Sequence, residues 1–320
     1  MKIVVTGAAG FVGTHLLNAL ESGHTTDIEI IPTAQTAFTR ADGHVVRALE
    51  ITQRVAINAF VQEVRPTHIV HLAGVPSIAA TRADPVRAWE VNLMGTLDLA
   101  RAVLEHAPDC ALIFAGSSES YGASAMSGEP LTESHRLQPL NEYAATKSAA
   151  DLALGALAAS GLKAIRFRPF NHTGPGQTPD FVVPAFASQI ARIEKGIQSP
   201  AIHVGNLDVK RDFLDVRDVV DGYIAAIKAS DDLARGTVIN LASGNARTIR
   251  DILESLLRLS TTKIEVRPDP HRQRSNDIPS IVGDATLARK LLGWWPNRPF
   301  DKTLLDVLDY FREQTKGSNS

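Results

Sequence analysis

The chain has 320 residues, of which 44% are hydrophobic, so it is long enough to bury a full core. Lysine and arginine total 33 against 35 acidic residues, and this balance excludes binding of nucleic acid or of an anionic membrane by bulk positive charge. The single cysteine, Cys110, excludes an internal disulfide framework and a CxxC metal site, so we expect a buried core cysteine and no bound metal.

The first residues form a short β-branched run that leads directly into glycines. This segment has no apolar leader followed by a small-residue cleavage site. No apolar run in the chain approaches the roughly 18 residues that a membrane span needs. We therefore expect a cytoplasmic protein without a membrane partner.

Short β-branched runs alternate with helical periods through the first half of the chain. The runs cover residues 3–6, 28–31, 45–49, 68–72, 112–115 and 163–167. This alternation predicts an α/β fold, namely a doubly wound parallel Rossmann sheet with helices on both faces. The alternation of strands and helices becomes less regular beyond residue 167. This change predicts a smaller C-terminal α/β substrate-binding lobe, with a helix from Thr248 to Leu259. We expect a dinucleotide-binding domain over 1–167, with return segments at about 206–245, and a lobe over 168–320.

Three glycines follow the first predicted strand. Gly7, Gly10 and Gly13 open a helical pattern that continues through Leu16 and Leu20. The first glycine permits a tight strand exit, the second lets the backbone approach a pyrophosphate, and the third lets the helix pack on the sheet. The position of the motif favours a nicotinamide dinucleotide over a plain glycine-rich turn.

The end of the second predicted strand bears on the choice of cofactor. An acid there accepts a hydrogen bond from a ribose 2′-hydroxyl and repels a 2′-phosphate. The sequence at 31–35 contains no acid, which favours NADPH, and no arginine stands there either, Arg40 being the nearest. NADPH and NADH both remain open.

A tyrosine and a lysine stand four residues apart on a predicted helix that follows Asn141. Tyr143 and Lys147 therefore lie on one helix face. A neighbouring cation favours the phenolate, so we expect a lowered tyrosine pKa and proton exchange with a substrate oxygen near neutral pH. The lysine is also placed to contact the nicotinamide ribose.

A serine-rich turn follows the strand at 112–115, at the sheet edge where doubly wound folds bind ligands. Ser117 is expected to share the substrate oxygen with Tyr143, and Glu119 to act as a further acid or base. A turn that only caps the next element is the alternative.

Together these motifs resemble the extended short-chain dehydrogenase/reductase family over nearly the whole chain. The resemblance places Ser117, Tyr143 and Lys147 on the family's catalytic triad. It implies cofactor contacts from the glycine motif and from three further segments: Phe11, Val12, Glu50, Ile51, Leu72, Ala73, Gly74 and Asn92. It also implies a homodimer built on the helices that carry Asn92 and Tyr143.

The segment after residue 168 and a later arginine cluster form the predicted substrate end. Arg211 is a candidate diphosphate clamp because its guanidinium suits phosphate oxygens, although pairing with Asp212 or Asp215 is the alternative. Arg274 and Asp277 are candidates for the diphosphate and a ribose hydroxyl, or belong to a solvated face. The remaining expected substrate contacts are Ser118, Glu119, Asn171 and Gln177.

Within the family, the run from Phe170 to Gln177 is most similar to the reductases of GDP-4-keto-6-deoxy-D-mannose. The resemblance implies NAD(P)H-dependent reduction of the 4-keto group of a nucleotide-linked 6-deoxy sugar, giving GDP-D-rhamnose. One alternative is a nucleotide-sugar 4-epimerase or 4,6-dehydratase that retains its cofactor, which an acid at Glu119 supports. The other is a redox-sensing protein that binds NAD(P) without catalysis.

Overall fold

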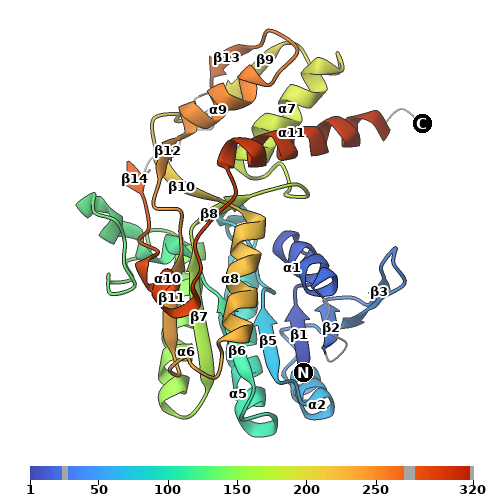
Figure 1. Ribbon diagram of the computed structural model, residues 1–320, viewed down its shortest axis with the longest axis vertical. Helices are drawn as coiled ribbons and strands as arrows, with labels where there is room; N and C mark the ends of the chain where they lie inside the picture. Colours follow the sequence, from blue (N-terminus) through green and yellow to red (C-terminus); the bar gives the residue numbers. More distant parts are fainter. Residues whose placement is uncertain (24–27, 270–277, 318–320) are drawn as a thin grey trace.

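An eight-stranded sheet forms the body of the computed structural model, which describes residues 1–23, 28–269 and 278–317. The strands lie in the order β11-β7-β6-β5-β1-β2-β4-β3 (Figure 1). Neighbours pair in parallel, except that β3 pairs antiparallel with β4. The strands are β1 (Lys2–Thr6), β2 (Glu29–Ala34), β3 (Phe38–Thr39), β4 (Val45–Ala48), β5 (His68–His71), β6 (Ala111–Ala115), β7 (Lys163–Pro169) and β11 (Thr237–Leu241).

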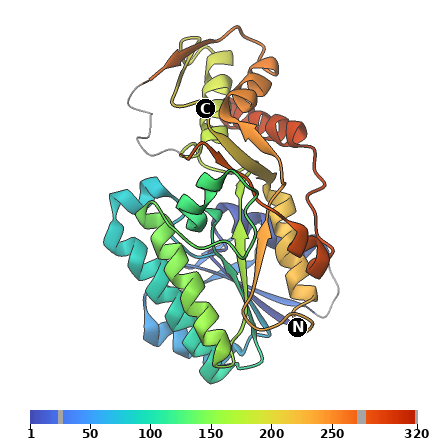
Figure 2. The same cartoon turned by 90° about the vertical axis from the view of Figure 1, so that its left-hand side faces the viewer.

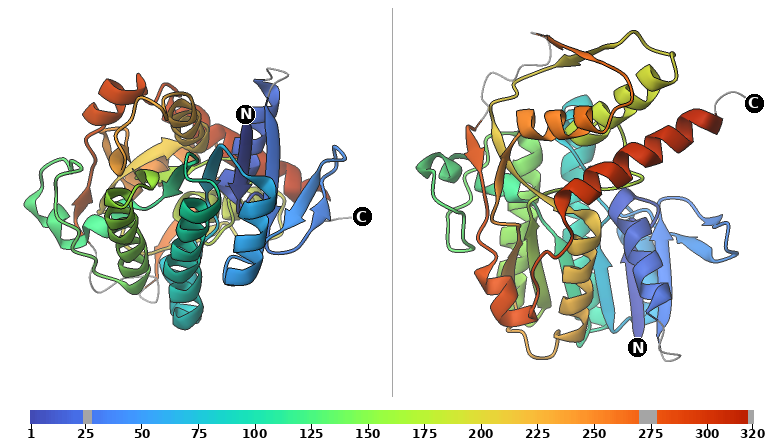
Figure 3. Two further views of the ribbon diagram at one scale, coloured as in Figure 1. Left: turned by 90° about the horizontal axis from the view of Figure 1, so that it is seen from below. Right: turned by 45° about the horizontal axis from the view of Figure 1, so that its top comes forward.

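Helices cover both faces of this sheet (Figures 1 and 3). One layer contains α1 (Phe11–Ser22), α8 (Val216–Lys228) and α10 (Thr286–Leu292), and the other contains α2 (Arg54–Val64), α5 (Thr96–His106) and α6 (Glu142–Ala159). Shorter turns connect them: α3 (Ile78–Ala83), α4 (Pro85–Trp89), the π-helical η1 (Glu90–Gly95) and the 3₁₀-helical η2 (Ser118–Ser127). Each layer buries its own apolar cluster, and Cys110 lies in one of them as expected. The predicted doubly wound α/β sheet is confirmed.

A smaller lobe lies beyond the carboxyl ends of the sheet strands (Figures 1 and 2). Its four-stranded sheet combines β8 (Asn171–Thr173), β10 (Lys210–Asp215), β12 (Ala246–Thr248) and β14 (Ser280–Ile281). The pair β9 (Ala201–Val204) and β13 (Glu265–Pro268) and the helices α7 (Val182–Glu194), α9 (Ile249–Arg258) and α11 (Phe300–Gly317) complete it. The three helices share one apolar core. The predicted second lobe is therefore present, while the exact division of the chain at residue 167 stays a prediction.

The chain crosses between the two lobes more than once. Strand β11 pairs in parallel with β7, so a segment after residue 236 returns to the large sheet. Helix α9 begins at a capping box in which Thr248 and Asp251 each accept a hydrogen bond from the other's backbone N–H, which confirms the expected helix. Among the described residues, no helix has both the length and the apolar character to cross a membrane.

Candidate active site

The loop between β1 and α1 has the backbone that a dinucleotide requires. Gly7 has φ +68°, and a Cβ there would lie 2.7 Å from the backbone nitrogen of Ala73. A Cβ on Gly13 would lie 2.3 Å from the carbonyl oxygen of Gly7, so the helix can pack this closely only with glycine. Gly10 is the N-cap of α1 and supplies no side-chain acceptor. The N–H groups of the first helical turn, which includes Phe11, therefore suit an anionic phosphate.

The loop after β5 lies beside this motif and reaches helix α6. Asn92, on the π-helical turn η1, accepts a hydrogen bond from the Val75 backbone (2.8 Å) and donates one to Thr146 Oγ1 (3.0 Å). A Cβ on Gly74 would lie 2.9 Å from Asn92 Oδ1 and 3.3 Å from Lys147 Nζ. Gly74 therefore lies close to both Asn92 and Lys147, and Asn92 is bonded to the neighbouring Thr146 of α6.

A buried hydrogen-bonded chain holds this loop in place. Thr96 Oγ1 donates to the Asn92 carbonyl (2.8 Å), so it can only accept from His71 Nε2 (3.0 Å). His71 Nδ1 then accepts from Thr6 Oγ1 (2.7 Å), which in turn accepts from the Ala73 N–H (3.2 Å). Burial, with a smaller contribution from the charge of Lys147, lowers the pKa of His71 to about 3. The imidazole is therefore neutral and carries its proton on Nε2. It links Thr6 to Thr96, a role that the sequence motif did not indicate.

The structure brings the three predicted catalytic residues together. Ser117 is the N-cap of η2 and contacts the phenol of Tyr143. Lys147 Nζ donates to the carbonyl oxygen of Ala115 at the end of β6 (3.0 Å), and its side chain is buried. These side chains lie at the carboxyl edge of the large sheet, next to the glycine loop and the β5 loop.

The pKa shifts of the pair differ from the expectation. Burial raises the pKa of Tyr143 to about 12, which outweighs the hydrogen bond from Ser117, and the negative charge of Glu119 raises it further. The expected lowering of the Tyr143 pKa by Lys147 is therefore wrong, because burial would remove water from the phenolate and Lys147 donates to the Ala115 carbonyl instead. Burial also lowers the pKa of Lys147 to about 8.

The two remaining residues of the serine-rich turn lie close by. Ser118 is buried and Glu119 is half-buried. Asn141 caps α6 by accepting from the Ala144 N–H (2.9 Å), and its amide donates to Glu119 Oε2 at 3.4 Å. The start of the Tyr143 helix is thus tied to the carboxylate of the turn, and only the capping role of Asn141 has a signal in the sequence.

The predicted cofactor contacts Glu50 and Ile51 occupy the start of a loop after β4. Glu50 pairs with Arg87 through both carboxylate oxygens (3.0 Å each) and also accepts from Thr52, and these bonds hold its pKa below its usual range despite partial burial. Ile51 is buried against Gly95. The carboxylate of Glu50 therefore already has partners, and its role toward the cofactor stays a prediction.

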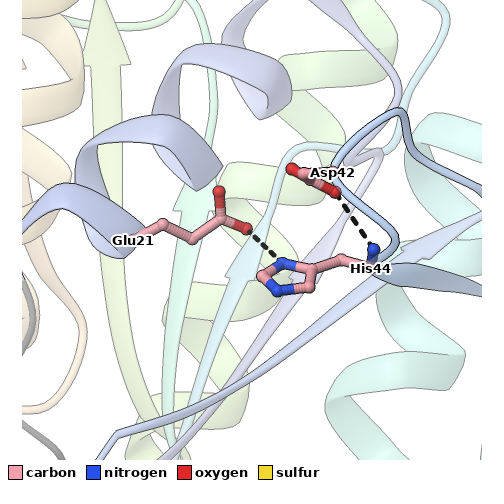
Figure 4. A group of neighbouring side chains, drawn as sticks. All are labelled: Glu21, Asp42 and His44. Atoms are coloured by element: carbon pink, nitrogen blue, oxygen red, sulfur yellow. Dashed lines mark hydrogen bonds and ion pairs between the residues drawn. The ribbon is translucent and has the colours of Figure 1, made fainter.

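Arg40 lies in a polar cluster on the β3–β4 hairpin. Its guanidinium binds Glu21 (2.6 Å), Asn18 (3.1 Å) and Asp42 (2.9 Å). His44 also contacts Glu21, at 3.2 Å, so Glu21, Asp42 and His44 form a group with the spacing of metal ligands (Figure 4). Because Arg40 already places a positive charge on both carboxylates, the cluster is explained as an ion-pair network.

The predicted substrate residues lie on the smaller sheet and the loop before α7. Asn171 is paired in register with Phe213 of the neighbouring strand. Gln177 is buried and donates to the His172 carbonyl (3.1 Å), while its side-chain oxygen has no partner among the described residues. Arg211 donates to the carbonyl of Ile278 (2.8 Å). Arg274 and Asp277 lie outside the described residues.

A buried ionic network supports the far side of helix α6. Asp151 of α6 binds Arg166 (2.8 Å) and Arg168 (2.9 Å) of β7. Arg168 also donates to the hydroxyl of Tyr121 (3.1 Å), which donates to Asn240 of β11 (2.7 Å). The network joins α6, η2 and two strands, and the sequence gives no signal for it because its members are far apart along the chain.

The segment that holds the glycine loop, the β5 loop and the Ser-Tyr-Lys group, residues 3–242, matches the NAD dependent epimerase/dehydratase family. The chain belongs to this family. A curated relative, the GDP-6-deoxy-D-mannose reductase of Pseudomonas aeruginosa, is 31% identical over 316 residues, which cover 98% of each chain. Membership makes the protein an NAD(P)-dependent enzyme, and the expected family resemblance is confirmed.

Two solved structures of this family are also similar to the chain. RMD from Pseudomonas aeruginosa complexed with NADPH has a TM-score of 0.86 and 29% identity, with 98% of this chain and 99% of that chain covered. UDP-glucose 4-epimerase of Thermus thermophilus in complex with NAD has a TM-score of 0.83 and 26% identity, with 98% and 99% covered. The family fold therefore extends over both lobes of the protein.

Proposed function

We propose that this protein reduces the 4-keto group of a nucleotide-linked 6-deoxy sugar, and that its substrate is GDP-4-keto-6-deoxy-D-mannose, which gives GDP-D-rhamnose. The observation that carries this proposal is a half-buried, protonated Tyr143 in contact with Ser117 at the cofactor edge of the sheet. The similarity to the Pseudomonas aeruginosa GDP-6-deoxy-D-mannose reductase along the whole chain supports the substrate.

The pKa of Tyr143 suits reduction. A keto group that becomes an alcohol needs a proton on its oxygen, and a phenol with a pKa of about 12 is protonated at neutral pH. Bound NADPH supplies the hydride for C4. Tyr143 then donates its proton to that oxygen and Ser117 holds the oxygen by a hydrogen bond. Lys147, one turn further along the same helix, would stabilise the phenolate that is left once its ammonium turns from the Ala115 carbonyl toward the phenol.

NADPH is the cofactor that we propose. The residues at the end of β2 include no acid that would repel a 2′-phosphate. The similar Pseudomonas aeruginosa structure was solved with NADPH. Titration of the protein with NADPH and NADH by fluorescence tests this: we expect tighter binding of NADPH, and tighter binding of NADH would contradict it.

Glu119 favours a second candidate function. Its carboxylate raises the pKa of Tyr143, so the two groups are near neighbours, and an acid at this place can remove or return a proton. A 4-epimerase or 4,6-dehydratase would oxidise the sugar first and then return the hydride, without net use of the cofactor. The similar Thermus thermophilus UDP-glucose 4-epimerase, solved with NAD, keeps this alternative open.

One assay separates the two functions. The purified protein is mixed with GDP-4-keto-6-deoxy-D-mannose and NADPH, and the absorbance of the reduced nicotinamide is followed. We expect a stoichiometric loss of that absorbance with formation of a 6-deoxyhexose product. Cofactor that copurifies with the protein and is not consumed, with UDP-glucose or GDP-mannose turned over, would favour the epimerase or dehydratase.

A cytoplasmic homodimer is the form that we propose for the enzyme. Apolar side chains are exposed on two helices that pack on each other, Met94 (48% exposed) on η1 and Leu152 (61% exposed) on α6. The partly exposed alanines between Ala145 and Ala156 allow close helix packing. Light scattering is expected to give twice the chain mass, with Leu152→Glu shifting it to the monomer.

A further inference from the structure

The segment 171–177, which carries predicted substrate residues, is bonded to the first turns of helix α1. His15 Nε2 lies 2.8 Å from the carbonyl oxygen of Pro175, 160 residues further along the chain. Because a carbonyl oxygen can only accept, His15 carries a proton on Nε2 and donates it. One turn earlier on α1, the ring of Phe11 stacks on His172, with ring centres 6.2 Å apart and planes at 6°. The helix that begins at the glycine loop therefore contacts the predicted substrate segment directly.

This contact leaves little room for movement between the helix and the segment. A Cβ on Gly174 would lie 2.5 Å from Cγ1 of Val216, the first residue of α8, and 3.6 Å from the ring of Phe11. The ring of Phe11 also meets His15 edge-on, with ring centres 5.4 Å apart. Because closely packed groups transmit a displacement, a shift of the first turns of α1 must move the segment as well.

The segment has internal bonds and also hydrogen-bonding capacity that its own residues do not use. His172 Nδ1 donates to the Phe170 carbonyl (2.9 Å), and burial lowers the pKa of His172 more than this bond raises it, so the ring is neutral at neutral pH. Gln177 donates to the His172 carbonyl (3.1 Å). The side-chain oxygens of Thr173 and Gln177 are buried and have no partner among the described residues. Since buried polar atoms are normally bonded, these two oxygens suit a ligand.

We propose that His15 is a positioning residue, which couples the binding of cofactor and substrate by tying the first turns of α1 to Pro175. This inference rests on the proposed nucleotide-sugar function. The N–H groups at the start of α1 suit the phosphates of the cofactor, and bonds to them restrain the first turns of the helix. Through His15 the same restraint holds the segment 171–177, so less ordering remains to oppose binding of the nucleotide sugar. The coupling is reciprocal, because each ligand must change the affinity of the other by the same factor.

Calorimetric titration of the full-length protein with GDP, UDP and dTDP, with and without saturating NADPH, measures this coupling. These diphosphates carry no sugar, so NADPH is not consumed. For the diphosphate that binds best, we expect binding about tenfold tighter with NADPH present, and NADPH binding about tenfold tighter with the diphosphate present. His15→Phe keeps a ring against Phe11 and removes the bond to Pro175. It should reduce both factors to about twofold or less, while NADPH alone binds as in the wild type.

Two further variants make the test specific to the hydrogen bond. His15→Gln keeps an N–H donor near the place of Nε2 and should retain most of the coupling. His203→Phe makes the same exchange at an exposed position of β9 and should couple like the wild type. Full coupling in His15→Phe overturns the inference, and so does a loss of NADPH binding itself in that variant, which would assign His15 to the cofactor loop alone.

The outcomes also separate this inference from the proposed function. If NADPH leaves the diphosphate affinity of the wild type unchanged, in a protein that reduces the GDP-linked keto sugar, the role of His15 is overturned and the proposed function stays intact. Coupling with UDP or dTDP that depends on His15, in a protein that fails to reduce the GDP-linked sugar, supports His15 and overturns the proposed substrate. Absence of binding for all three diphosphates overturns both.

Discussion

The large sheet and the small sheet hold their charged residues in different ways. On the large sheet, Lys147 and Asp151 of helix α6 are buried and each is bonded to a neighbouring strand. On the small sheet, Arg211 and Arg247 lie on short strands and are only partly buried. The proposed function thus places the chemistry on a rigid helix whose side chains are held by neighbouring strands. It places the substrate contacts on short strands whose residues can change without disturbing that helix.

The largest expected effect of this difference is on stability. Asp151→Ala leaves Arg166 and Arg168 buried beside each other, and should lower the free energy of unfolding by about 3–5 kcal/mol. Asp208→Ala, which breaks the exposed ion pair with Arg250 in the small lobe, should leave stability nearly unchanged. Urea unfolding followed by circular dichroism measures both, and equal losses would contradict the distinction between the two sheets.

The burial of Lys147 should lower the stability of the folded protein by an amount that depends on pH. Its pKa is 10.5 in the unfolded chain and about 8 in the folded one, so only the unfolded chain holds the proton between these values. The wild type therefore loses about 3 kcal/mol of stability as the pH falls from 10.5 to 8, and no more below that. Lys147→Met is expected to lack this loss and to lack activity. A difference in stability between the two proteins that is constant with pH would contradict the account.

Substitution of Tyr143 tests the proposed chemistry without a change in the charge of the protein at neutral pH. Tyr143→Phe removes the proton donor, and turnover should fall by roughly 10² or more while NADPH binding stays near that of the wild type. Tyr310→Phe, on α11 of the small lobe, serves as the matched control and should retain full activity. Turnover within a few-fold of the wild type in Tyr143→Phe would exclude the phenol as the donor.

The smallest expected effect is that of Ser117. Ser117→Ala removes one hydrogen bond to the substrate oxygen and also the acceptor for the Glu119 N–H (3.2 Å). We expect kcat to fall roughly tenfold with little change in KM, since the bond matters most while charge develops on that oxygen. Steady-state kinetics measure this, and a rise in KM alone would assign the serine to substrate binding.

The sequence predicted the large sheet, and which candidate site residues come together at its edge, because those signals are local. Gly7, Gly10 and Gly13 stand close together in one loop, and Tyr143 and Lys147 are one helical turn apart. The expected strands are rich in β-branched and other apolar residues and are flanked by helical periods. Each prediction therefore needed only a short window of residues.

The small sheet and the buried networks could not be predicted in this way. Strand β10 pairs with residues 171–173, 246–248 and 280–281, strands of two or three residues that are far apart along the chain. Arg211 and Arg247 come to lie opposite each other only once those strands are in register. The raised pKa of Tyr143 depends on burial, which overrides the neighbouring lysine that the helical spacing emphasised.

The central claim is that the protein delivers a hydride from the nicotinamide to C4 of a keto sugar. The most direct test uses NADPH that carries deuterium at the transferable position of the nicotinamide, with GDP-4-keto-6-deoxy-D-mannose as the substrate. Mass spectrometry and NMR of the product should find one deuterium, at C4. A product without deuterium, or unreacted labelled cofactor beside an isomerised sugar, would contradict the account.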